Sequence, residues 1–264
     1  MKFVRRHLLT VYAIAAFAYL LVPIGIVILF SFNNPAGRFN YTWQGFTLDH
    51  WRNWDAIPGL REAMTLSLEI ALIASILATV LGTLIALALV RYGFRGRGAT
   101  NLLIFLPMAT PEIVLGASLL TLFININVFL GFTTILIAHI MFCISYVVVT
   151  VKARLVGFDR SLEEAAMDLG ANEWMTFRKV TLPLIAPAIL AGGLLSFALS
   201  VDDFVITYFN AGSEVTFPLF VWGAARVGAP PQVNVMGTLI FVVALSLMVV
   251  NVMLQRRRES QVRA

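Results

Sequence analysis

Charged residues are scarce in this chain of 264 residues. Only 12% are Asp, Glu, Lys or Arg, whereas about 25% is usual in a soluble domain. Hydrophobic residues make up 59%, which is more apolar surface than a soluble globule of this size can bury. This composition excludes a soluble enzyme and a disordered chain. Cys143 is the only cysteine, which excludes a disulfide scaffold and predicts a small buried side chain.

The sequence also lacks the patterns of common catalytic and metal sites. It contains no G-x-x-x-x-G-K-[ST] phosphate loop, so the chain cannot hydrolyse ATP by that route. No arrangement of nucleophile and base is apparent, so no catalytic residue is assigned. His139 lies in the middle of an apolar run with no Cys, Asp or Glu at ligand spacing. We therefore expect a packed or hydrogen-bonded histidine, and no metal site or cofactor in this chain.

Long apolar runs are the main feature of the sequence. A helix that crosses a membrane needs about 20 mostly apolar residues. Six stretches meet this requirement, without the alternation of a membrane β-barrel. The sequence therefore predicts an all-α membrane protein with six transmembrane helices. The predicted spans are Leu8–Phe32, Ala63–Val90, Asn101–Phe123, Thr133–Val151, Leu184–Ile206 and Val235–Leu254. Gly82 and the pair Gly192-Gly193 are expected to permit close helix packing within them.

The positions of Lys and Arg predict the orientation, because basic residues concentrate in cytoplasmic loops. If both termini are cytoplasmic, 15 of the 19 basic residues lie inside, and only Arg38, Arg52, Arg61 and Arg226 lie outside. The inside group is Lys2, Arg5, Arg6, Arg91, Arg95, Arg97, Lys152, Arg154, Arg160, Arg178, Lys179, Arg256, Arg257, Arg258 and Arg263. The basic C-terminal cluster is interpreted as a flank of the last span and not as a nucleic-acid site.

The inner loop between the fourth and fifth predicted spans has strong local signals. Ser161 followed by Glu164 predicts a capping box at the start of a short helix. Gly170 is placed to end that helix in the left-handed conformation. Asn172 can cap a second short helix, and Pro183 is expected to interrupt the chain before the fifth span. The sequence thus predicts two short helices joined at a glycine.

The same loop carries a signature with fixed spacing. It reads Glu164-Ala165-Ala166, then Gly170, Val180 and Leu182-Pro183. This pattern resembles the EAA signature of permease subunits of binding-protein-dependent ABC importers, with Val180 in place of Ile. Further segments resemble the second permease subunit of spermidine/putrescine importers. They are residues 91–96 (RYGFRG), 111–114 (PEIV), 157–159 (GFD) and 200–204 (SVDDF).

The resemblance implies the type I ABC importer permease fold in a bacterial cytoplasmic (inner) membrane. The implied partners are ABC ATPase subunits that bind ATP and Mg, a sister permease subunit in a heterodimer, and a soluble binding protein that delivers a polyamine. It also implies that the inner loop couples to the ATPase. The implied coupling residues are Glu164, Ala165, Ala166, Gly170, Leu182 and Pro183. The implied organisation is an N-terminal helix and periplasmic loop over 1–61, a transmembrane domain over 62–254 with its loop at 152–183, and a basic cytoplasmic tail over 255–264.

Four acids lie in or at the edge of predicted spans: Glu69, Glu112, Asp202 and Asp203. An ionisable group near the bilayer centre costs at least about 2.5 kcal/mol and usually faces a protein interior or a wet path. No Lys or Arg lies well inside any span, so the acids have no such partner and favour a cationic solute. The candidate path residues are Glu112, Asp202 and Asp203, with Tyr208 close by.

Each acid also has a structural interpretation. Glu112 lies about 17 Å into the third span, after Pro107 and Pro111. It can bond to backbone groups freed by a proline kink. Asp202 and Asp203 diverge by about 100° on a helix, so one can face the path while the other bonds to a neighbouring helix or to water. For Glu69, an interhelical hydrogen bond or snorkelling is the favoured interpretation.

Three functional hypotheses remain. The favoured one is a permease subunit of an ATP-driven importer, with a polyamine as solute and ferric iron, an organic cation or an amino acid as alternatives. A self-sufficient secondary transporter would have no need of the inner loop, and we see no inverted repeat. An intramembrane enzyme would require a catalytic constellation that the sequence does not contain.

Overall fold

The protein is described by a computed structural model that covers residues 2–37 and 39–263. For residues 2–7, 247–248, 250–252 and 254–263 it describes the backbone alone. The expectations for Arg38 and for the basic side chains near both ends therefore lie outside the described residues. The described chain is helical, with one isolated antiparallel bridge between Asn33 and Phe46. The helices are α1 (Lys2–Phe30), α2 (Asp49–Arg52), α3 (Leu60–Arg91), α4 (Arg97–Ala109), α5 (Glu112–Asn125), α6 (Phe132–Val156), α7 (Ser161–Asp168), α8 (Glu173–Thr176), the π-helix η1 (Phe177–Thr181), α9 (Leu182–Asp202), α10 (Val205–Asn210), α11 (Phe217–Val227) and α12 (Pro231–Arg263).

The chain divides into two compact units, residues 1–61 with 221–264 and residues 62–220. In the first unit, α1 packs along α12, and Gly237 faces Val27. The connection after α1 is organised by Asn33, whose side chain is fully buried. Its amide donates to Asn40 Oδ1 at 2.6 Å, and its carbonyl accepts the Gln44 N–H at 2.7 Å. The Asn33 amide thus supplements a short antiparallel pairing, in which the Asn34 N–H donates to the Gly45 carbonyl and the Thr47 N–H to the Phe32 carbonyl.

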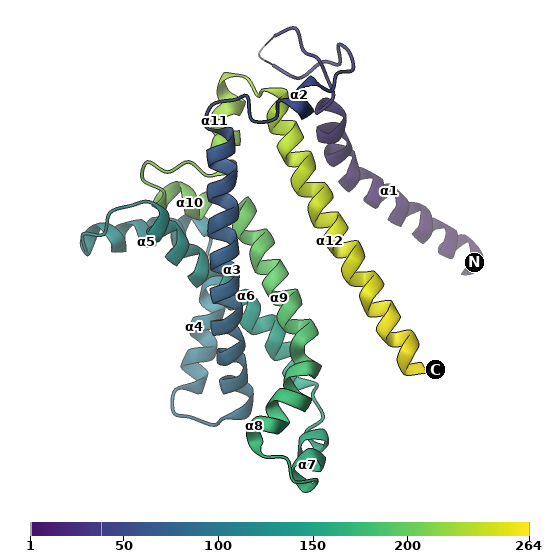
Figure 1. Cartoon of the computed structure of the whole chain (residues 1–264), viewed down its shortest axis with the longest axis vertical. Coiled ribbons are helices and arrows are strands. Elements are labelled where there is room, and N and C mark those ends of the chain that lie inside the picture. The colour runs from purple at the N-terminus through teal and green to yellow at the C-terminus, as the bar shows by residue number, and fades with distance from the viewer. Residues whose placement is uncertain (1, 38, 264) are drawn as a thin grey trace. The chain divides into compact units, whose positions relative to one another are not determined.

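In the second unit, α6 is the central helix (Figure 1). Its buried residues lie on several sides of the helix, because α3, α4, α9 and α10 all pack around it. A Cβ at Gly82 of α3 would lie 2.7 Å from Val147 Cβ, and one at Gly192 of α9 would lie 3.4 Å from Val147 Cα. The predicted close packing at these glycines is confirmed, since α3 and α9 both approach α6 at Val147.

Four helices are long and apolar enough to cross a membrane, and a fifth crossing results if the bent pair α4 and α5 is one span. The four correspond to the predicted first, second, fourth and fifth spans. The apolar part of α12, Pro231–Ser246, is shorter than this criterion requires among the residues that the structure describes. The all-α membrane class is therefore confirmed, with four or five such helices by length and composition.

The third predicted span, Asn101–Phe123, is not one helix. It is broken after Ala109, and α4 and α5 are bent by 110°. Thr110 adopts extended geometry, as expected of a residue that precedes a proline, and Pro111 stands immediately before α5. The bend expected from Pro107 and Pro111 is therefore confirmed, and the depth of Glu112 in the membrane stays a prediction.

The fifth predicted span also ends differently. Helix α9 stops at Asp202, Asp203 is extended with ψ of 119°, and the separate short helix α10 follows. The predicted end at Ile206 took α9 and α10 as one helix. At the other end, η1 carries α8 directly into α9, so the helical path from Glu173 to Asp202 is continuous.

Candidate functional site

The second unit contains two polar clusters in which residues distant in sequence meet. One joins α6, α9 and α10, and we call it the His139–Asp203 network (His139, Ser200, Asp203 and Thr207). The other joins α3, α7 and η1, and we call it the loop-base cluster (Arg91, Glu163 and Thr181). Both contain candidate residues or neighbours of the sequence signatures.

Asp203 occupies the break between α9 and α10. Its carboxylate accepts the Thr207 N–H at 2.8 Å and the Ile206 N–H at 3.4 Å, and it also accepts the Thr207 hydroxyl at 2.8 Å. These backbone donors belong to the first turn of α10 and have no carbonyl partner within that helix. Asp203 therefore ends α9 and caps α10 at the same point.

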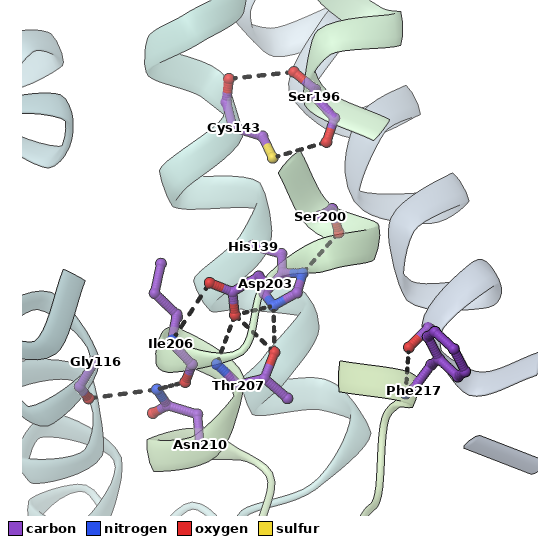
Figure 2. A network of polar contacts seen from close by, with 11 residues as sticks. Gly116, His139, Cys143, Ser196, Ser200, Asp203, Ile206, Thr207, Asn210 and Phe217 are labelled. Carbon is purple, nitrogen blue, oxygen red and sulfur yellow. Dashed lines mark hydrogen bonds and ion pairs between the residues drawn. The ribbon is translucent and has the colours of Figure 1, made fainter. Parts of the chain in front are cut away.

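His139 of α6 completes the network (Figure 2). Its Nδ1 lies 2.7 Å from Ser200 Oγ, and its Nε2 lies 2.9 Å from Thr207 Oγ1 and 3.3 Å from Asp203 Oδ2. Because the Thr207 hydroxyl donates to Asp203, the proton on the imidazole belongs on Nε2, and Nδ1 accepts from Ser200. The predicted hydrogen-bonded histidine is confirmed. Its partnership with Asp203 corrects the expectation that the acids lack a basic partner within the chain.

A second set of bonds extends this network to α5. The Asn210 side chain donates to the Ile206 carbonyl at 2.8 Å and to the Gly116 carbonyl at 3.4 Å (Figure 2). The Thr134 hydroxyl of α6 donates to the Asn210 carbonyl at 2.7 Å. A Cβ at Gly116 would lie 2.8 Å from the Phe209 ring, so glycine lets α5 approach α10. Helix α10 is thereby fixed on two sides.

The four candidate path residues lie in different environments. Asp203 is buried within its hydrogen bonds, whereas the adjacent Asp202 is exposed. Tyr208 is 59% exposed, and its ring lies against Phe204 and Phe209. Glu112 is exposed in the first turn of α5. The structure thus separates the two adjacent aspartates, one inward and one outward.

The inner loop contains the predicted pair of short helices, α7 and α8. Gly170 has φ of +89°, and open space surrounds its Cα where a Cβ would lie, so the backbone conformation alone demands glycine here. Asn172 caps α8, because its side chain accepts the Met175 N–H at 2.8 Å. Both of these predictions are confirmed, since each depends on a few consecutive residues.

Two other predictions for this loop are wrong. Ser161 is the first residue of α7 and not the capping residue before it, so the helix begins one residue earlier than the capping box predicted. Asp159 Oδ1 accepts the Ser161 N–H at 3.0 Å. This bond lowers the pKa of Asp159. Pro183 does not interrupt the chain. It lies in the first turn of α9, where a missing N–H is tolerated, and the Leu182 N–H bonds to the Phe177 carbonyl across η1.

The signature residues lie on and beside α7. Glu164 and Ala165 are exposed and Ala166 is half-buried, whereas Leu182 and Pro183 lie at the start of α9. Apolar side chains near the glycine are also exposed: Leu169 is 90% exposed and Trp174 is 69% exposed. These two apolar side chains lie beside the signature residues and are not covered by the rest of the chain.

Sequence reasoning missed the loop-base cluster. Arg91 donates to both oxygens of Glu163, with Nη2 to Oε1 at 2.6 Å, and the Thr181 hydroxyl donates to the same Oε1. The Arg91 guanidinium also lies over the Phe158 ring, 5.4 Å from its centroid. The Arg91 hydrogen bonds, with a smaller contribution from Thr181, hold the pKa of Glu163 below its ordinary value. The only local signal for this cluster was the position of Glu163 next to Glu164, and that position does not reveal a partner in α3.

Among the residues that the structure describes, no group of three or more His, Cys, Asp or Glu side chains gathers to hold a metal ion. Other contacts fix the ends of the loop. Lys152 Nζ donates to Asn101 Oδ1 at 2.7 Å, and Arg154 Nε donates to the Leu184 carbonyl at 3.2 Å. These bonds connect the end of α6 to α4 and α9.

Comparison with known proteins identifies relatives over nearly the whole chain. The profile of the family described as binding-protein-dependent transport system inner membrane component matches residues 78–260. The spermidine/putrescine transport system permease protein PotC of Haemophilus influenzae is 40% identical over 96% of this chain and 98% of its own. PotC of Escherichia coli is 42% identical over 92% of this chain and 91% of its own. A bacterial ABC transporter for import of the polysaccharide alginate has the same fold, with a TM-score of 0.69 and 17% identity over 97% of this chain and 98% of its own.

Proposed function

Because the chain belongs to the family of inner membrane components of binding-protein-dependent transport systems, we propose that it is a permease subunit of an ATP-driven polyamine importer. The observation that carries the choice of solute is the 42% identity to a spermidine/putrescine permease over 92% of the chain. A soluble binding protein delivers the solute, and a sister permease subunit forms the other half of the path. A partner ATPase binds ATP and Mg, since this chain contains no phosphate loop.

The proposed topology has six spans with both termini in the cytoplasm. The spans are α1, α3, the pair α4 and α5, α6, α9 and α12. The proposed organisation places an N-terminal helix and periplasmic loop at 1–61, the transmembrane domain at 62–254 and a cytoplasmic tail at 255–264. The distribution of basic residues supports this orientation.

Cysteine labelling tests the topology. Ala165→Cys should react with a membrane-impermeant maleimide only from the cytoplasmic side, and Ala225→Cys only from the periplasmic side. Right-side-out and inverted vesicles provide the two accessible faces. Cys143 is buried, so the unsubstituted chain is the background control. Reaction of both introduced cysteines from the same face would contradict six spans.

In the proposed mechanism, the inner loop contacts the ATPase through the exposed face of α7. Glu164, Ala165 and Ala166 lie on this helix, and Gly170 sets its angle to α8. Leu182 and Pro183 carry the movement into α9, because the helical path through η1 is continuous. Exposed Leu169 and Trp174 supply apolar area for the contact.

The proposed path for the solute includes Glu112, Asp202 and Tyr208. A polyamine brings several positive charges into a low-dielectric region, where carboxylates and aromatic faces must replace its water. Both acids and the Tyr208 ring are exposed in the isolated chain. Asp203 supports the path indirectly. Its hydrogen bonds to Thr207 fix the turn after α9 that leaves Asp202 exposed.

The experiment is reconstitution of the complex purified through this chain, with its binding protein, in proteoliposomes. Calorimetry of the binding protein against spermidine, putrescine, amino acids and ferric iron identifies the solute. Asp202→Asn and Glu112→Gln keep the shape of each side chain and remove its charge. At least one should lose spermidine uptake while the complex assembles and hydrolyses ATP. Normal uptake by both, or calorimetric binding of an amino acid or iron in place of polyamine, would contradict the proposed path or solute.

A further inference from the structure

The loop-base cluster connects three elements that the chain order separates. Arg91 is the last residue of α3, Glu163 lies in α7, and Thr181 ends η1 immediately before α9. Glu163 is 8% exposed and Thr181 is 2% exposed. The cluster therefore lies beneath α7, where the loop joins the helices that carry it.

One carboxylate joins both neighbouring helices. Arg91 binds the two Glu163 oxygens with two N–H groups, and the Thr181 hydroxyl also donates to Oε1. A bidentate pair fixes both distance and orientation, which a single bond does not. Because a displacement of α7 that breaks neither bond must carry the end of α3 and the start of α9 with it, the geometry of the cluster is that of a mechanical link.

The adjacent glutamate has a different position. Glu164 is exposed and belongs to the signature face of α7, whereas Glu163 is directed about 100° away into the protein. The two acids thus divide two tasks between them. Glu164 is available to a partner, and Glu163 is already engaged by this chain.

We propose that Glu163 is a positioning residue that transmits movement of α7 to α3 and α9 during the transport cycle. This inference rests on the proposed function and adds a second route for movement, besides the continuous path through η1. Arg91 connects Glu163 to α3 through a charged pair with two hydrogen bonds, and Thr181 connects Glu163 to α9. Without the link, α7 follows the ATPase while α3 stays behind.

The first test compares transport with ATP hydrolysis in proteoliposomes that contain the whole complex. Glu163→Gln retains the size and an acceptor for Thr181 but loses the charged pair. We expect spermidine uptake to fall about tenfold, the size of effect that loss of a charge-assisted hydrogen bond produces, while ATP hydrolysis stimulated by the loaded binding protein is retained. Glu62→Gln, an exposed glutamate in the first turn of α3, makes the same change elsewhere and should leave both rates unchanged.

Two further variant sets keep the inference falsifiable if Glu163→Gln fails to assemble. Thr181→Val removes the hydroxyl at constant shape and should lower uptake per ATP, whereas Thr181→Ser should restore it. Arg91→Glu should uncouple transport, and the exchange Arg91→Glu with Glu163→Arg should recover part of the uptake. A proportional fall of uptake and ATP hydrolysis, or wild-type ratios in all variants, would overturn the proposed link.

A distance measurement does not depend on the solute. Spin labels at Asp168→Cys on α7 and Tyr92→Cys beside α3, both exposed positions, are placed in a Cys143→Ala chain. With the link intact, their separation should stay constant between the ATP-bound and ADP-bound states, and Glu163→Gln should make it change. If the label separation changes between the two nucleotide states in the labelled chain that retains Glu163, the link is refuted. A wild-type complex that hydrolyses ATP but takes up no spermidine refutes only the proposed solute.

Discussion

Asp203 and Glu163 are both buried acidic residues, each 8% exposed, but their partners differ in chemistry. Asp203 is held by backbone N–H groups, a hydroxyl and an imidazole that joins α6 to α10. Glu163 is held by a guanidinium, which stays charged at every physiological pH. The first set organises a helix break inside the packed core, and the second ties a loop to the helices below it. Burial of an acidic residue therefore does not by itself determine its function, because the elements that a carboxylate joins determine what its loss disturbs.

The largest expected effect is on stability, at the His139–Asp203 network. Asp203→Ala would leave the Thr207 hydroxyl and the N–H groups of Ile206 and Thr207 buried without their acceptor. We expect the free energy of unfolding to fall by about 3 kcal/mol, as for removal of one member of a buried pair. Asp202→Ala changes the adjacent, exposed carboxylate and should leave stability nearly unchanged. Thermal unfolding of the purified complex in detergent measures both, and equal melting temperatures for the two variants would contradict the structural assignment of Asp203.

In the loop region, the largest expected effect is on coupling and not on stability. Gly170→Val places a β-branched residue at φ of +89°, which costs about 1–2 kcal/mol in the left-handed region. The angle between α7 and α8 should change, so spermidine uptake should be lost while membrane insertion and ATP hydrolysis are retained. Gly93→Val is the matched control, since a Cβ there also meets open space and no positive φ is involved. Full uptake by Gly170→Val at normal expression would show that the angle is unimportant.

The same comparison explains which features the sequence could predict. The long helices α3 and α6 follow from apolar length, and Gly170 and Asn172 follow from turn chemistry within a few residues. All of these are local properties. The sequence also indicated that one of the two adjacent aspartates could bond to a neighbouring helix, and Asp203 does contact His139 of α6, but from the extended break after α9 and not from a helical position.

The features that sequence reasoning missed depend on residues far apart. Arg91 and Glu163 are separated by 72 positions, and His139 and Thr207 by 68. A search for ligands at local spacing around His139 could not find Asp203, which arrives from another helix. The proline signals predicted a bend at Pro111 but not its angle of 110°, because packing of α5 against α10 sets the direction. Likewise, the π-helical hydrogen bonds of η1 accommodate Pro183 without a break in the helix, and no single residue type predicts such a pattern.

The smallest expected effect is the pH dependence of the stability that Glu163 contributes. The Arg91 hydrogen bonds hold the pKa of Glu163 below its ordinary value of 4.5. A carboxylate with a lower pKa in the folded state contributes stability that is fully present above its unfolded pKa and is lost as the pH falls through the folded value. The stabilising contribution of Glu163 should thus be constant near neutral pH and should decrease below about pH 4.5. Because the pair is partly exposed, salt should weaken it. Thermal unfolding of the wild-type and Glu163→Gln complexes between about pH 7 and pH 3 measures this difference, with Glu62→Gln as the control. A gap between the two melting temperatures that stays constant to the acid end would show that the Glu163 charge contributes nothing to the loop base.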